Sequence, residues 1–200
     1  ISTGASNLDE IRYAINILKK KTSKIVIMHC ILNYPTKNED ANLKMISSLK
    51  KEFPNYVIGY SDHTMPDNNM TNITTAFILG AKVIEKHFTH DKNLKGNDHY
   101  HSMDFRDLKN LSRNLKKIIK ILGPFSIKKA IKSELKSRKF ARRSIVTNKN
   151  LKKGSKIKDN DLIGLRPNIG ISTIFWKKVI GKKVKRNLKK GQTLNWTDFY

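Results

Sequence analysis

The sequence predicts an α/β fold with parallel strands, followed by a small, mostly β domain. Two observations lead to this fold class. Over residues 1–122, helical and strand-like patterns alternate strictly with short connections, which is typical of parallel strands covered by helices. Further along, NLKKGSKIKDNDL at 150–162 recurs as NLKKGQTLNWTDF at 187–199, a spacing of 37 residues without a long helical pattern.

The alternation can be followed element by element. Asn7 is a favourable helix cap, because Glu10 stands three residues later and an apolar stripe follows. Asp104 is expected to cap a long amphipathic helix. The other expected helices are 39–53 and 72–80, and the expected strands are 24–30, 56–61 and 82–88. With IST at 1–3 as the tail of a strand, there are about four βα units, which make half of an eight-stranded barrel or a small open sheet.

Residues 123–140 break the alternation and are predicted to be a linker between a first domain, 1–122, and a second, 141–200. Within the second domain, each copy of the repeat has a Lys-Lys-Gly turn, a short β-like run and an acidic residue before a final apolar one. A duplication of this size predicts a small domain with internal pseudo-symmetry. We interpret the repeat as structural rather than catalytic.

Composition limits the class of protein. Cys30 is the only cysteine, so no internal disulfide forms and a reducing compartment fits best. No apolar run approaches the roughly 20 residues of a bilayer span, so a soluble, cytoplasmic protein without a membrane partner is expected. Because the chain starts at Ile1, in what reads as the end of a strand, we expect it to be a fragment of a longer protein.

The formal net charge of +25 is distributed unevenly along the chain. Residues 109–200 hold 27 Lys or Arg against 4 Asp or Glu, an asymmetry that is compatible with nucleic-acid binding. However, most of these lysines are scattered singly or in pairs, with no stacking aromatics between them. A solvated basic surface is therefore favoured over a nucleic-acid partner, and anionic small substrates would also suit a positive field.

Two histidines stand at matched positions after consecutive strands. Ser61 and His63 share one face of the chain, as do Glu85 and His87. Neighbouring strands lie about 4.8 Å apart, so both imidazoles can bind one borderline divalent ion, such as Mn²⁺, Fe²⁺ or Zn²⁺. Either histidine alone is better explained as a hydrogen-bonded residue at a strand end, whereas for the pair at matched positions the residues leave both interpretations equally open. His101 is interpreted as a loop residue.

At this point the motifs resemble those of a known family. STGASN, NYPT, YSDHT, LGAKVIEKHFT, GNDH, ARRSIV and RPNIGIS, in this order over nearly the whole chain, closely resemble the sialic acid synthase family. These enzymes condense phosphoenolpyruvate with an N-acylated hexosamine, such as N-acetylmannosamine, to a nine-carbon acidic sugar. The resemblance implies the C-terminal half of a (β/α)8 TIM barrel, made of the last four βα units, followed by an antifreeze-like (SAF) domain.

The resemblance also implies roles for individual residues. His63 and His87 would hold a divalent metal, typically Mn²⁺, with Mg²⁺ or Co²⁺ as alternatives. Glu85 is expected to orient water or to stabilise a cationic centre beside the metal. The substrate-binding residues it implies are Ser2, Asn33, Tyr34, Ser61, Asp98 and Arg166.

These substrate-binding residues divide into three groups by the part of the substrate they would contact. Ser61, helped by Ser2 and Asn33, would hold the phosphate. Tyr34 and Asp98 would approach the sugar. Arg166, from the antifreeze-like domain, would reach the N-acyl group of sugar bound in the partner subunit of a domain-swapped homodimer.

Two departures from the family keep other functions open. Leu32 occupies a position that usually carries a small polar residue, and the N-terminal half of the barrel, with its phosphoenolpyruvate contacts, lies outside these 200 residues. We therefore expect the chain alone to be poorly active. A non-catalytic remnant and a basic nucleic-acid-binding module are the alternatives, and the motifs do not determine which N-acyl sugar is used.

Overall fold

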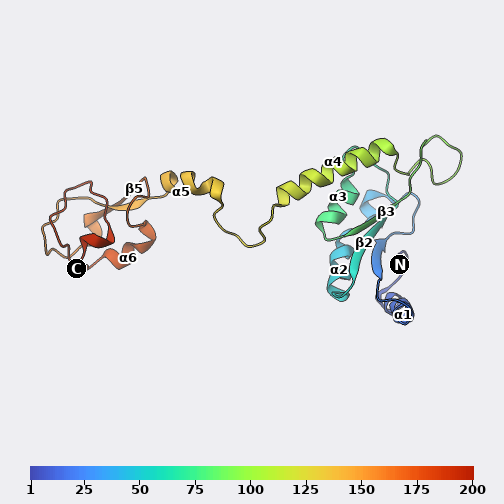
Figure 1. Ribbon diagram of the computed structural model, residues 1–200, viewed down its shortest axis with the longest axis horizontal. Coiled ribbons are helices and arrows are strands. Elements are labelled where there is room, and N and C mark those ends of the chain that lie inside the picture. The colour runs from blue at the N-terminus through green and yellow to red at the C-terminus, as the bar shows by residue number, and fades with distance from the viewer. The chain divides into compact units, whose positions relative to one another are not determined.

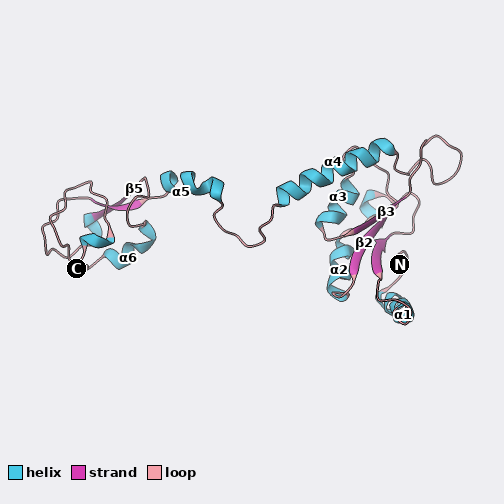
Figure 2. Ribbon diagram, in the orientation of Figure 1, coloured by secondary structure: helices cyan, strands magenta, loops and turns pink.

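The computed structural model describes all 200 residues and divides them into two compact units, Ile1–Pro124 and Phe125–Tyr200 (Figure 1). Each unit has its own cluster of buried apolar side chains. Helices and strands alternate in the first unit, whereas loops and turns make up most of the second (Figure 2). No helix has the combination of length and apolar character that crossing a bilayer requires.

The first unit is built on a three-stranded parallel sheet with the order β1-β2-β3. Its strands are β1 (Val26–Cys30), β2 (Val57–Asp62) and β3 (Val83–Lys86). Residues 1–3 continue the sheet beyond β1, because Ser2 forms a parallel bridge with Met28. The predicted parallel strands, and the reading of IST as part of a further strand, are confirmed.

Four helices belong to this unit: α1 (Leu8–Leu18), α2 (Lys44–Glu52), α3 (Thr71–Ile78) and α4 (Phe105–Leu122). α2 packs on β1 and β2, and α3 packs on β2 and on α4, as Figure 1 shows. Asn7 and Asp104 cap α1 and α4 with their side chains, each in a capping box with the acidic residue three positions later. Both predicted helix starts are therefore confirmed.

The two faces of the sheet differ in chemistry because the strands pair in a fixed register. On the face covered by helices, Ile27 and Ile58 are paired neighbours and belong to the buried core. On the opposite face, the register places Cys30 beside Ser61 and Ser61 beside Glu85. This second row of side chains leads directly to the carboxyl ends of the strands.

Three expected elements differ from the structure. The helix expected at 39–53 begins only at Lys44, after a short 3-10 turn, because Asn42 has a φ of +45°, which a right-handed helix cannot include. The linker expected at 123–140 contains a second 3-10 turn and helix α5 (Leu135–Ala141). Every residue of α5 is exposed, so no buried apolar face distinguished it from a linker. The strand expected at 82–88 ends at Lys86.

The second unit combines one antiparallel pair, β4 (Ser144–Thr147) with β5 (Leu162–Leu165), and a short helix, α6 (Trp176–Val179). Its core is formed by ten buried apolar side chains: Ile145, Leu151, Ile157, Leu162, Ile171, Val179, Val184, Leu188, Leu194 and Phe199. Most of these lie outside regular strands and helices, so turns and isolated bridges carry the fold of this unit.

The 37-residue duplication corresponds to a pseudo-two-fold arrangement in the second unit. Leu151 and Leu188, which are equivalent in the two copies, exchange both backbone hydrogen bonds at 2.8 Å. Asn150 accepts a bond from the backbone NH of Lys190, and its equivalent, Asn187, accepts one from Lys153, each at 2.8 Å. The predicted pseudo-symmetry is confirmed, and its repeated side chains are occupied by internal contacts.

A buried ion pair joins β2 to β3 on the helix-covered face. The Lys86 ammonium lies 3.0 Å from the Asp62 carboxylate, and the two side chains are 1% and 2% exposed. Lys86 also donates to the carbonyl of Thr64 at 2.6 Å, while Asp62 accepts bonds from Tyr60 and Thr64. Burial lowers the pKa of Lys86, and the neighbouring Asp62 opposes that shift.

We expect the Lys86→Met substitution to lower the free energy of unfolding by about 3–5 kcal/mol, because it leaves the buried carboxylate of Asp62 without its cation. Chemical denaturation followed by far-UV circular dichroism measures the change. Lys82→Met is the matched control, since Lys82 is exposed just before β3, and its effect should stay within about 0.5 kcal/mol. Equal stability of the two variants would contradict the role given to this pair.

Candidate active site

Three histidines surround the ring of Tyr34 beyond the carboxyl ends of β2 and β3. The Tyr34 ring centroid lies 4.1 Å from that of His63, 5.8 Å from that of His87 and 6.0 Å from that of His101. The His63 and His87 rings are 5.3 Å apart and almost perpendicular. The chain therefore gathers imidazoles from two strand ends and one loop around one exposed phenol.

His63 is held in one orientation by the segment that follows β1. Its Nδ1 atom lies 2.9 Å from the carbonyl oxygen of Ile31 and 3.8 Å from the sulfur of Cys30. A carbonyl only accepts hydrogen bonds, so Nδ1 carries the proton and Nε2 keeps its lone pair. Histidine ligands of metals are commonly oriented by such a bond from the other ring nitrogen, so His63 has the form that a metal ligand needs.

Ser61 and Glu85 form the polar end of the row of side chains that begins at Cys30. The Ser61 hydroxyl donates to the Glu85 carboxylate at 2.7 Å, and Ser61 is buried while Glu85 is exposed. Glu85 shares one face of the sheet with His87, as Ser61 does with His63, so the bond holds the carboxylate on the face that carries the two histidines. A negatively charged group thus lies next to imidazoles and hydroxyls, a set able to bind, orient and exchange protons with a small substrate.

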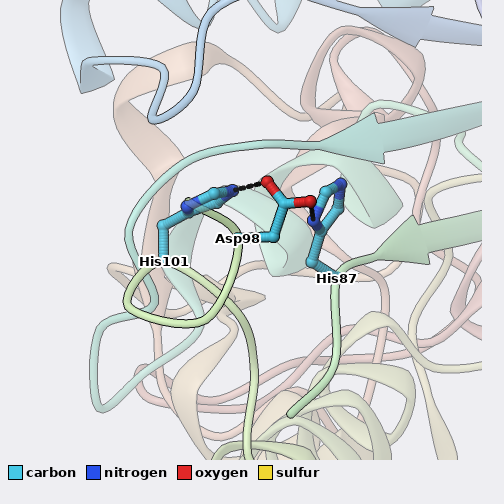
Figure 3. Close-up of side chains that lie close together, drawn as sticks. All are labelled: His87, Asp98 and His101. Atoms are coloured by element: carbon cyan, nitrogen blue, oxygen red, sulfur yellow. Dashed lines mark ion pairs between the residues drawn. The ribbon is translucent and has the colours of Figure 1, made fainter. Parts of the chain in front are cut away.

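The loop 89–103 returns Asp98 and His101 to His87 (Figure 3). One carboxylate oxygen of Asp98 lies 3.7 Å from His87 Nδ1, and the other lies 4.0 Å from His101 Nε2. His101 was expected to be an ordinary loop residue, but its side chain is fully buried. Sequence reasoning missed it because only its spacing of three from Asp98, in the stretch DHYH, hinted at a shared site.

The remaining residues proposed from the sequence lie as follows. Ser2 is exposed beside β1, and Asn33 is exposed with its carbonyl accepting a 2.9 Å bond from Thr36. Both flank the strand ends that carry the site, although no contact joins either to the histidines. Arg166 belongs to the second unit, where it is exposed and donates through Nε to the carbonyl of Ala141 at 2.8 Å.

Comparison with known proteins identifies the family. Residues 1–126 match the model of the NeuB family, and residues 142–199 match the SAF domain. The chain belongs to the sialic acid synthase family. The resemblance noted in the motifs is thereby confirmed, together with the presence of an antifreeze-like SAF domain after the α/β unit.

Several relatives in this family are named as synthases of legionaminic or pseudaminic acid. The chain is 41% identical to the N,N'-diacetyllegionaminic acid synthase of Legionella pneumophila, covering 98% of this chain and 55% of that protein. It is 35% identical to the pseudaminic acid synthase of Campylobacter jejuni, covering 100% of this chain and 57% of that protein. The chain thus spans a little over half the length of these relatives.

Solved structures agree with the family. The N-acetylneuraminic acid (sialic acid) synthetase of Leptospira borgpetersenii, solved with citrate, is 36% identical with a TM-score of 0.60, over 68% of this chain and 46% of that one. A putative spore coat polysaccharide biosynthesis protein E from Chromobacterium violaceum has a TM-score of 0.82 over 100% of this chain and 59% of that one. At 21% identity, this second likeness supports the fold alone.

We expect the Cys30 thiol to react slowly with alkylating reagents at pH 8, because it is 5% exposed and its burial raises its pKa. Labelling with iodoacetamide, followed by peptide mass mapping, should be at least about tenfold slower in the folded protein than in denaturant. Equal labelling rates in the two conditions would show that Cys30, where the row of side chains begins, is open to solvent in the folded protein.

Proposed function

We propose that the protein condenses phosphoenolpyruvate with an N-acylated hexosamine to a nine-carbon, sialic-acid-type sugar and releases phosphate by C–O cleavage. The observation that carries this proposal is the gathering of His63, His87, Tyr34 and the Ser61–Glu85 pair at one edge of the sheet, in a chain of the sialic acid synthase family. The names of the relatives support the product class.

We propose further that the first unit is the C-terminal half of a (β/α)8 barrel. The parallel order β1-β2-β3, with residues 1–3 as a fourth neighbour and helices on one face, supports this. In such barrels the active site lies at the carboxyl ends of the strands. His63 and His87 follow those ends, as that architecture requires.

The proposed reaction joins anionic phosphoenolpyruvate to a neutral N-acylated sugar in a defined order of steps. Carbon 3 of phosphoenolpyruvate forms a bond to the aldehyde carbon of the open-chain sugar, whose oxygen takes up a proton. The oxocarbenium centre left at carbon 2 is stabilised by the Glu85 carboxylate, which Ser61 orients at 2.7 Å. Water adds to that centre and loses a proton, and the bond between carbon 2 and the phosphate oxygen then breaks as the new hydroxyl becomes a carbonyl and gives up its proton to the leaving phosphate.

The polar side chains near the strand ends are the groups that would contact the two substrates. In our proposal, Ser61, with Ser2 and Asn33, binds the phosphate, and the exposed Tyr34 and Asp98 contact the sugar. Desolvation, and after it the nearby Cys30, Asp98 and Glu85, raise the pKa of the Tyr34 phenol. Tyr34 thus stays neutral, so its hydroxyl both donates and accepts hydrogen bonds at neutral pH.

The histidines fit a divalent metal. His63 has Nδ1 bonded to Ile31, which leaves Nε2 free as a ligand, and His87 lies next to it with a carboxylate at 3.7 Å. His63 and His87 would hold Mn²⁺, or Mg²⁺ or Co²⁺, whose Lewis acidity would polarise the aldehyde oxygen of the sugar.

The exposed Arg166 extends the proposal to a homodimer. A guanidinium in the SAF domain is a strong donor for the carbonyl of an N-acyl group. Its Nε is already bonded to Ala141, which leaves the terminal NH₂ groups to donate. We propose that Arg166 contacts sugar bound by the partner subunit of a domain-swapped dimer.

The complete protein, incubated with phosphoenolpyruvate, Mn²⁺ and a panel of N-acyl hexosamines, should release phosphate and form a nine-carbon acid detectable by mass spectrometry. In ¹⁸O-labelled water, C–O cleavage places the label in the sugar and leaves the phosphate unlabelled. His63→Ala and His87→Ala should each lower kcat by at least about 100-fold, since even outer-shell partners of a metal site contribute 10- to 100-fold. The control His90→Ala, at an exposed position outside the cluster, should keep full activity.

Other outcomes identify the competing functions. Labelled phosphate would overturn the cleavage mode, and an active His63→Ala,His87→Ala double variant would overturn the role of these histidines. Absence of turnover with every sugar, in a folded complete protein, would identify a non-catalytic remnant. Tight binding to duplex DNA that persists at physiological salt would instead identify a nucleic-acid-binding module.

A further inference from the structure

We propose that His87, Asp98 and His101 form a two-histidine, one-carboxylate site for a divalent transition-metal ion, in which His101 is a ligand that the motifs do not assign. One donor atom from each residue lies within 4.8 Å of the other two (Figure 3). The inference deepens the proposed function and rests on it, because His87 is shared with the proposed catalytic pair.

The burial of His101 is the first argument for a ligand. Its side chain is fully buried, and neither Nδ1 nor Nε2 has a hydrogen-bond partner. A buried polar group without a partner destabilises a fold by about 1–3 kcal/mol, so such groups are nearly always satisfied. The Asp98 carboxylate lies 4.0 Å from Nε2, which is too far for a hydrogen bond but close enough to share an ion.

The arrangement of the donors is the second argument. The Asp98 carboxylate points one oxygen at His101 and the other at His87, and the two imidazole rings are 5.2 Å apart. Ligand bonds to zinc of about 2.0–2.2 Å imply donors about 3–3.5 Å apart. The separations in this cluster, up to 4.8 Å, exceed that range by about 1.3–1.8 Å at most, and Asp98, which is 64% exposed, has room to move toward the two imidazoles.

The loop that carries the two new donors is fixed at its base. Thr89 donates to the carbonyl of Met103, and Met103 donates to that of His87, each at 2.8 Å. Within the loop, Thr89 bonds to His99 at 2.9 Å, and Ser102 donates to the carbonyl of Asp98. These bonds return the loop to His87, so little chain entropy is left to lose when an ion joins the three side chains.

The donor set indicates the class of ion. Imidazole and carboxylate ligands suit borderline ions such as Mn²⁺, Co²⁺ and Zn²⁺, and three protein ligands leave positions open for water or substrate. His101 would thus raise the affinity of the site beyond that of a pair of histidines alone. His63, whose ring lies 5.3 Å from that of His87, can add a fourth nitrogen to the same ion.

The test uses Co²⁺ and Zn²⁺ with the complete protein, purified free of metal. Co²⁺ titration followed by visible absorption gives the dissociation constant and a ligand-field spectrum. His101→Ala and His101→Gln should each weaken Co²⁺ binding by about tenfold or more and change that spectrum. His90→Ala, which removes an exposed histidine from the same loop, is the matched control and should change neither.

A measurement without substitutions guards against a folding defect in the variants of this buried residue. In the unmodified protein, Zn²⁺ should shift the imidazole ¹⁵N resonances of both His87 and His101 in long-range ¹H–¹⁵N spectra. Unchanged resonances of His101, or unchanged Co²⁺ affinity and spectrum in folded His101→Gln, would overturn the inference.

The same titration separates this inference from the proposed function. If His63→Ala and His87→Ala lose Co²⁺ binding while His101→Gln retains it, the two-histidine centre stands and the role of His101 is rejected. If metal binding depends on His101 but the complete protein releases no phosphate from phosphoenolpyruvate, the metal site stands and the proposed reaction is rejected.

Discussion

The buried ion pair between Asp62 and Lys86 is the constraint on which the site depends. It joins β2 to β3 one residue before each strand-end histidine, and Lys86 bonds across to the carbonyls of Asp62 and Thr64, on either side of His63. A pair with side chains 1% and 2% exposed cannot shift without leaving a charge unpaired in the interior. The ion pair therefore fixes the relative positions of the two histidines from the helix-covered face of the sheet.

The alternation of side chains along each strand also determines which groups face the candidate site. Since Asp62 and Lys86 face the helices, their neighbours Ser61 and Glu85 face the other way and meet at 2.7 Å. The same register that buries the charges also aligns Ser61 and Glu85, the groups proposed to take part in the chemistry. Stability and function are thus assigned to opposite faces of the same strands, and changes on the helix-covered face act on the site only through its geometry.

The sequence predicted what periodicity and motif spacing determine. The parallel strands, the caps at Asn7 and Asp104 and the pseudo-symmetric repeat all follow from local patterns that the structure bears out. What the sequence did not predict depends on the path of the chain in space. The left-handed backbone at Asn42 shortens α2, and the return of the 89–103 loop buries His101. Neither of these two features produces a periodic pattern in the sequence.

The duplication in the second unit also explains why Arg166, the residue proposed to contact the sugar, is found outside the repeat. Asn150 and Asn187 bond across the pseudo-two-fold axis, and Asp161 and Asp198 are buried in equivalent capping contacts, so the repeated polar groups are already used. In the sequence, Arg166 lies between the two copies of the repeat, so the pseudo-symmetry places no constraint on this residue. The Ser144 hydroxyl donates to the carbonyl of Pro167 and accepts from the amides of Ile169 and Gly170. These three bonds hold the segment that follows Arg166 in place. The repeated polar groups of the second unit are thus bonded to one another, and the exposed segment that carries Arg166 is the part held by contacts that the pseudo-symmetry does not repeat.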